Sequence, residues 1–191
     1  MLFLKKCLSY LIPVKIETRR GEITPVLEIA LVNGKYVLNG ERVNYSFGGL
    51  HEVFKRTFKK FRLEQYSFEN MLILGFGAGS VAHLLRNEFN QQGAITGVEN
   101  DAVMLDLALE YFNTTTLPGL TLVQEDAALF AENSTATYDL VVIDLFIEEH
   151  IPGQFQQPKF MQALRRMLRK DGVLFFNVIT EEKTNRADEP A

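Results

Sequence analysis

Residues 71–80 read Met-Leu-Ile-Leu-Gly-Phe-Gly-Ala-Gly-Ser, an apolar run that passes directly into three glycines at alternate positions. Four consecutive apolar residues are typical of a short strand buried on both faces of a parallel sheet. Glycine at 75, 77 and 79 lets the backbone take positive φ angles and lets another group approach closely. The stretch therefore predicts a buried strand, a tight turn and a helix that begins near Val81.

Apolar strands and amphipathic helices alternate from this stretch onward. The predicted strands are residues 71–74, 94–98, 120–123, 138–143 and 173–179, and the predicted helices are residues 81–89, 102–112, 127–132 and 160–168. Asp101 is placed to cap the second of these helices. The alternation predicts an α/β, Rossmann-like fold with a doubly wound, mainly parallel sheet. The residues after 180 are mostly polar and charged, so we expect the sheet to be truncated after its fifth strand.

The first 49 residues have a different pattern, with short alternating runs and turn residues. Residues 26–32 and 35–38 flank Asn33-Gly34, a pair that favours a tight β-hairpin turn because both residues tolerate positive φ. Asn39-Gly40 predicts a second turn. A helix follows over residues 50–61, with an apolar face (Leu50, Val53, Phe54, Thr57, Phe58 and Phe61). We therefore divide the chain into an N-terminal β-hairpin lobe (1–49), a Rossmann-like domain (50–180) and a disordered tail (181–191).

Composition excludes several classes of protein and of site. The formal net charge of the 191 residues is −4, so the basic footprint of a nucleic-acid-binding protein is absent, and the basic side chains of helix 50–61 are interpreted as a solvated face. The single cysteine excludes an internal disulfide and favours a cytoplasmic location. The three histidines show no metal-ligand spacing, so no metal site is expected. The apolar start of the chain is too short to span a membrane and is interpreted as a small amphipathic helix.

Acidic residues follow three of the first four predicted strands. Glu99 ends the second strand about 20 residues after the glycine-rich turn, where a carboxylate can accept hydrogen bonds from ribose hydroxyls. Asp126 follows the third strand and is placed to accept from an adenine amino group, or to cap the next helix. Asp144 follows the fourth strand. In a parallel sheet these ends meet at one edge, so we expect an adenosine site formed by them and the backbone of residues 75–79.

These segments resemble the successive nucleoside motifs of spermidine synthases and their methyltransferase-like relatives. The resemblance is carried by Leu72–Ser80, Gly97–Asp101, Glu125-Asp126-Ala127 and Asp139–Asp144. It extends over about residues 26 to 180. It implies a class I methyltransferase fold and binding of S-adenosylmethionine, or of its decarboxylated form, by Gly75, Gly77, Ala78, Gly79, Glu99, Asp126 and Ala127. It also implies that Asp144 is the catalytic residue, as a base or as a group that orients the substrate.

The chain departs from the spermidine synthase pattern at three places. Ala78 stands where those enzymes carry an aspartate that would attract the aminopropyl ammonium, and Ile147 replaces a second aspartate of the catalytic segment. A tyrosine expected near His51 is missing. Glu52, Glu148 and Glu149 are the candidate substrate residues that could anchor an ammonium instead.

The sequence leaves three functions open. The favoured one is an S-adenosylmethionine-dependent methyltransferase-like protein of the spermidine synthase group, with an unidentified small-molecule acceptor. The second is a polyamine aminopropyltransferase that uses decarboxylated S-adenosylmethionine. The third is a catalytically silent nucleoside-binding or scaffold protein. The short sheet and the aromatic N-terminal half also lead us to expect a homodimer, with neither nucleic acid nor membrane as a partner.

Overall fold

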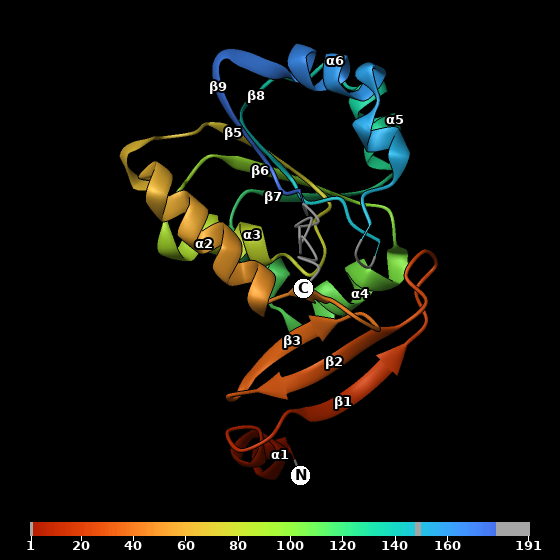
Figure 1. Ribbon diagram of the computed structural model, residues 1–191. Coiled ribbons are helices and arrows are strands. Elements are labelled where there is room, and N and C mark those ends of the chain that lie inside the picture. Colours follow the sequence, from red (N-terminus) through yellow and green to blue (C-terminus); the bar gives the residue numbers. More distant parts are fainter. Residues whose placement is uncertain (1, 148–149, 179–191) are drawn as a thin grey trace, which may run out of the picture.

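The computed structural model describes residues 2–147 and 150–178, which form two sheets (Figure 1). The N-terminal sheet is antiparallel and has the order β1-β2-β3-β4. Its strands are β1 (Val14–Arg19), β2 (Leu27–Val32), β3 (Lys35–Asn39) and β4 (Asn44–Ser46). The second sheet is parallel throughout and has the order β7-β6-β5-β8-β9. Its strands are β5 (Asn70–Leu74), β6 (Ala94–Glu99), β7 (Leu120–Gln124), β8 (Tyr138–Ile143) and β9 (Leu168–Phe176).

Helices cover both faces of the parallel sheet, as in a doubly wound fold. On one face lie α5 (Ala127–Asn133) and α6 (Pro158–Met167), and on the other lie α2 (Gly49–Phe61), α3 (Ser80–His83) and α4 (Ala102–Tyr111) (Figure 1). The N-terminal sheet lies beyond this second group, and α1 (Leu2–Leu8) lies at its outer end. No helix within the described residues is long and apolar enough to cross a membrane. The tail predicted for residues 181–191 falls outside the described part of the chain.

Alternate residues of the central strands enter two separate hydrophobic cores. In β5, Met71 and Ile73 join the core beneath α2, α3 and α4, whereas Leu72 and Leu74 join the core beneath α5 and α6. All four side chains are fully buried. This two-sided burial explains why these four consecutive residues are all apolar instead of alternating with polar ones.

The first core continues into the N-terminal sheet. Leu27, Ile29 and Leu38 of that sheet belong to the same buried cluster as Phe54 and Phe58 of α2. The predicted hairpin is confirmed, because Asn33 and Gly34 take φ angles of 50° and 75° and Val32 pairs with Lys35. The N-terminal sheet therefore packs on the parallel-sheet domain through side chains that both share.

Several predicted boundaries and faces were wrong in detail. The helix expected over residues 81–89 is a single α turn, α3, followed by a π-helical turn over Leu84–Glu88. The fifth strand starts at Leu168 and not at Val173, because Leu168 already pairs with Tyr138 before an irregularity shifts the register. Val53 of α2, expected to face inward, is 50% exposed, since the helix buries a narrower stripe than its apolar pattern predicts.

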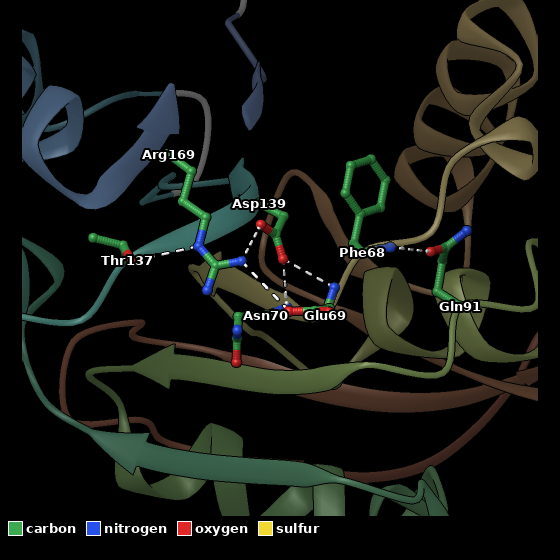
Figure 2. A network of polar contacts seen from close by, with 7 residues as sticks. All are labelled: Phe68, Glu69, Asn70, Gln91, Thr137, Asp139 and Arg169. Atoms are coloured by element: carbon green, nitrogen blue, oxygen red, sulfur yellow. Dashed lines mark hydrogen bonds and ion pairs between the residues drawn. The ribbon is translucent and has the colours of Figure 1, made fainter. Parts of the chain in front are cut away.

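A polar network connects the amino ends of three strands, at the end of the sheet opposite the glycine-rich turn (Figure 2). Asp139 of β8 accepts hydrogen bonds from the backbone N–H groups of Glu69 and Asn70, both at 2.9 Å, and from the guanidinium of Arg169 at 2.6 Å. Burial would raise the pKa of Asp139, but these donors outweigh it and lower the pKa. One carboxylate thus links β5, β8 and β9 and holds their register.

Candidate functional site

A pocket of about 280 Å³ opens at the carboxyl ends of β5, β6, β7 and β8. The glycine-rich turn forms one wall, and the N-terminal lobe contributes Ile23, Thr24 and Tyr45 to another. The remaining lining residues are Val98, Asn100, Asp101, Met104, Glu125, Ala127, Leu145, Phe146, Ile147, Pro152, Gln154 and Phe155, together with the three strand-end acids Glu99, Asp126 and Asp144. The three predicted acids thus meet at one cavity.

The glycine-rich turn is divided between the pocket and the core. Gly75 and Gly77 line the pocket and take φ angles of 81° and 55°. A Cβ on Gly75 would collide with the backbone carbonyl of Asp144, so glycine is required there by the close approach of two strand ends. Ala78 is fully buried, and its N–H donates to Ser46 Oγ at 3.0 Å. Ala78 and Gly79 lie outside the pocket lining, so the structure does not bring Ala78 to the ligand side of the turn.

Glu99 is held at the end of β6 by three backbone donors. Gly77 N–H donates to Oε2 at 2.9 Å, and the N–H groups of Asn100 and Asp101 donate to Oε1 at 2.9 and 3.1 Å. Burial raises the pKa of Glu99, although these three bonds favour its charged form. A carboxylate offers about four acceptor positions, so one remains, on Oε2, for a ligand hydroxyl.

Asp126 caps a helix, which is one of the two roles that the sequence allowed. Its Oδ1 accepts from the N–H groups of Ala128 and Leu129 at 2.8 and 3.1 Å, which caps α5. Its Oδ2 accepts from the side-chain amide of Gln154 at 2.9 Å. Ala127 is buried and lines the pocket beside it. The cap is thus confirmed, and the other carboxylate oxygen bonds to Gln154, a residue that also lines the pocket.

Asp144 follows β8 and is paired with a residue that sequence reasoning missed. Asn177, just after β9, donates from its side-chain amide to Asp144 Oδ1 at 2.9 Å. Burial raises the pKa of Asp144 to about 7, and the hydrogen bond from Asn177 and the charge of Glu99 act on it in opposite directions. Asn177 could not be found from sequence, because it becomes a neighbour of Asp144 only when β9 pairs with β8.

Asp101, predicted as a helix cap, also fastens the N-terminal lobe to the pocket. Its Oδ1 accepts from Val103 and Met104 at the start of α4. Its Oδ2 accepts from the N–H groups of Ile23 and Thr24 at 3.0 and 3.1 Å. Burial would raise the pKa of Asp101, but these backbone donors lower it. One buried carboxylate therefore positions the loop that supplies Ile23 and Thr24 to the pocket wall.

The predicted ammonium anchors are not assembled in the described part of the site. Glu52 is exposed on α2 and lies outside the pocket lining. Glu148 and Glu149 fall outside the described residues, whereas Ile147 does line the pocket. His51, next to Glu52, is engaged elsewhere, since its Nδ1 lies 2.7 Å from Ser80 Oγ.

Comparison with known proteins shows which family the chain matches. Residues 71–172, slightly more than half of the chain, match a family described as a methyltransferase domain. Over 107 residues the chain is 34% identical to a probable polyamine aminopropyl transferase of Bifidobacterium longum (strain NCC 2705), which covers 56% of this chain and 23% of that protein. The chain therefore spans only about a quarter of that relative's length.

Solved structures share the fold at low sequence identity. A probable spermidine synthase from Corynebacterium glutamicum ATCC 13032 superposes with a TM-score of 0.68 at 21% identity, covering 84% of this chain and 62% of that one. Human methyltransferase-like protein 13, solved in complex with SAH, gives a TM-score of 0.55 at 20% identity, covering 71% of this chain and 67% of that one. Together with the family match, these likenesses confirm the predicted fold: the chain belongs to the methyltransferase domain family and is similar, within it, to spermidine synthases.

Proposed function

We propose that the chain is a transferase that binds an S-adenosyl compound in this pocket and directs a group from it to a small-molecule acceptor. The observation that carries the proposal is the placement of Glu99 and Asp126 at neighbouring strand ends, facing one pocket beside a glycine turn. Glu99 keeps a free acceptor position for a ribose hydroxyl, and Asp126 keeps one for an amino group. The structures of two relatives, one in complex with SAH and one with the transition state analogue AdoDATO, support the same class of ligand.

The charge of the pocket supports a cationic ligand. The charged side chains that line it are Glu99, Asp101, Glu125, Asp126 and Asp144, and within the described residues no lysine, arginine or histidine lines it. Such a ligand supplies an electrophilic carbon bonded to a positively charged sulfur. Carboxylates near a sulfonium stabilise it through Coulomb attraction, which is strong where water is partly excluded. Once the group has been transferred the sulfur is neutral, so the acids hold the substrate more strongly than the product.

Asp144 is the group suited to proton transfer. A pKa of about 7 leaves this carboxyl partly ionised at neutral pH, which is the condition for an efficient general base. In the proposed reaction an amine nucleophile forms a bond to the transferred carbon while the carbon–sulfur bond breaks and its electron pair stays on sulfur. Asp144 accepts the proton that the nitrogen loses. An acceptor without a proton to lose would need Asp144 only to orient it.

Methyl transfer remains the favoured reaction and aminopropyl transfer the second. Ile147 at the pocket wall offers no charge to hold a polyamine ammonium, which favours methyl transfer. The absence of a basic side chain from the described lining favours a ligand without a carboxylate, and this supports the aminopropyl alternative. Calorimetry with both ligands separates them. A preference of about 100-fold for decarboxylated S-adenosylmethionine, about 2.7 kcal/mol, would overturn methyl transfer.

The adenosine site itself is tested with Glu99→Gln. An amide nitrogen in place of Oε1 would face two N–H donors, so it should instead replace Oε2, where it faces only Gly77 N–H. In that position it also removes the acceptor left for the ligand. We expect calorimetry to give a dissociation constant for S-adenosylhomocysteine about 10- to 100-fold weaker than that of the natural chain. Asp106→Asn, on the exposed side of α4, is the control and should leave it unchanged. Unchanged affinity in a folded Glu99→Gln variant would contradict the assignment of the adenosine site. If no S-adenosyl compound changes the melting temperature of the natural chain, that result would favour the scaffold alternative.

A further inference from the structure

Gln154 lines the pocket, and the hydrogen bond that its side-chain amide makes determines how the amide is oriented. It lies on the short 3₁₀ turn Gly153–Gln156, and its amide nitrogen donates to Asp126 Oδ2 at 2.9 Å. Because a carboxylate can only accept, the nitrogen must face Asp126 and the carbonyl oxygen Oε1 must point elsewhere. The turn is anchored by Phe155, which is buried and packs edge-on against Phe160 with ring centroids 5.3 Å apart.

Asp126 retains one acceptor position beside this amide. Its Oδ1 is used by the two N–H groups that cap α5, and among the described residues its Oδ2 receives a single hydrogen bond, the one from Gln154. Gln154 Oε1 accepts no hydrogen bond from the described residues. Two acceptor positions are therefore free: one on Asp126 Oδ2 and one on Gln154 Oε1. The hydrogen bond between the two side chains holds them next to each other, and both residues line the pocket.

We propose that Gln154 and Asp126 form a pair that selects the base of the bound nucleoside, accepting both hydrogens of the 6-amino group of a purine. The inference rests on the proposed function, because it requires a nucleoside in this pocket. Asp126 alone would accept one amino hydrogen, and Gln154 adds the acceptor for the other. Gln154 is thus a specificity residue that acts on the base, remote from the transferred group.

The pair should reject a purine that carries a 6-oxo group. A carbonyl oxygen offers no hydrogen, so it would face two acceptors at close range and leave both of these acceptor positions unfilled. Sites built to hydrogen-bond a ligand group discriminate strongly against an analogue that lacks the group, because their own polar atoms are then left unpaired. An amide that turned over, with its nitrogen in the place of Oε1, would weaken this effect, but turning over would break the hydrogen bond to Asp126.

The test compares 5′-methylthioadenosine with 5′-methylthioinosine, which differ at the 6-position and lack both the sulfonium and the amino-acid group. In the natural chain, calorimetry should show the adenosine form binding about 30-fold or more tightly than the inosine form. In Gln154→Leu the ratio should fall to about 5-fold or less, mainly through weaker binding of the adenosine form. Gln156→Leu is the matched control on the same turn. Within the part of the chain that the structure describes, Gln156 donates only to Ile151 O and lies outside the pocket lining, so this variant should keep the natural ratio.

The outcomes separate this inference from the proposed function. Tight adenosine binding with the same ratio in the natural chain and in Gln154→Leu overturns the pair while leaving the nucleoside site intact. A Gln154→Leu variant that loses affinity for both nucleosides equally also overturns it, because Gln154 would then only shape the turn. Failure of the natural chain to bind either nucleoside would overturn the proposed function together with the pair.

Discussion

Asn177 donates its side-chain amide to Asp144 across the gap between two neighbouring strand ends, at 2.9 Å from Oδ1. The backbone fixes the donor as well, since Asn177 N–H donates to the carbonyl of Ile143, the residue before Asp144. The described residues make no other hydrogen bond to the Asp144 carboxyl, so the oxygen Oδ2 is the one left to accept or release a proton. Asn177 thus orients a carboxyl that burial makes hard to ionise.

Replacing Asn177 should make Asp144 still harder to ionise. Asn177→Leu keeps a side chain of similar size but removes the hydrogen bond that favours the charged carboxylate, so the pKa of Asp144 should rise above about 7 by roughly one unit. Carbon NMR of labelled aspartate side chains measures this directly, with Asp144→Asn identifying the resonance. A pKa that stays the same in a folded variant would show that Asn177 does not act on the carboxyl.

Asp144 should also make the stability of the chain depend on pH. Its pKa is raised from 3.8 to about 7 on folding, so between these values the unfolded chain gives up the proton more readily than the folded chain. The neutral carboxyl of Asp144 therefore makes its full contribution to the free energy of unfolding below about pH 4. This contribution is lost as the pH rises toward 7. Asp144→Asn cannot ionise, and its advantage over the natural chain should grow by on the order of 2–4 kcal/mol between pH 4 and pH 8. Urea unfolding at several pH values measures the difference, and a constant gap would contradict it.

The contact between the N-terminal lobe and α4 should depend on Asp101. In Asp101→Asn an amide nitrogen must face either the N–H groups of Ile23 and Thr24 or those of the helix start, so donors meet donors. We expect a loss of about 2–4 kcal/mol in the free energy of unfolding, the scale for a buried charged group that loses its hydrogen bonds. Asp106→Asn on the same helix is exposed and should cost less than about 0.5 kcal/mol. Equal unfolding midpoints in urea for the two variants would be evidence against the role of Asp101.

The homodimer expected from the sequence is also open to test. Apolar side chains are exposed at the start of the chain, among them Phe3 at 77% and Leu11 at 82%. If these side chains form the dimer contact, the double variant Phe3→Lys, Leu11→Lys should shift the mass in light scattering from two chains to one at micromolar concentration. Glu64→Lys, on an exposed turn near the end of α2, should leave the mass unchanged. If light scattering gives the natural chain the mass of a monomer, the prediction of a homodimer is wrong.

The parallel sheet and the approximate site were within reach of the sequence because they depend on local patterns. A run such as residues 71–74 specifies a strand buried on both faces, and alternation with helices specifies a parallel sheet. Parallel strands place their carboxyl ends at one edge, so Glu99, Asp126 and Asp144 could be assigned to one pocket without coordinates. Asn33-Gly34 fixed its hairpin for the same reason, because the turn needs positive φ at both residues.

Contacts between distant segments were decided only by the tertiary structure. Asn177 reaches Asp144 through the pairing of β9 with β8, and Gln154 reaches Asp126 through the turn that Phe155 anchors. Ala78, placed at the ligand by its position in the motif, is instead turned into the core, where Ser46 of the N-terminal sheet holds its backbone. Periodicity reports which face of an element is apolar, but it carries no information on which distant side chain that face will meet. The positions of the strand-end acids therefore followed from the sequence, whereas the hydrogen bonds that orient them followed from packing.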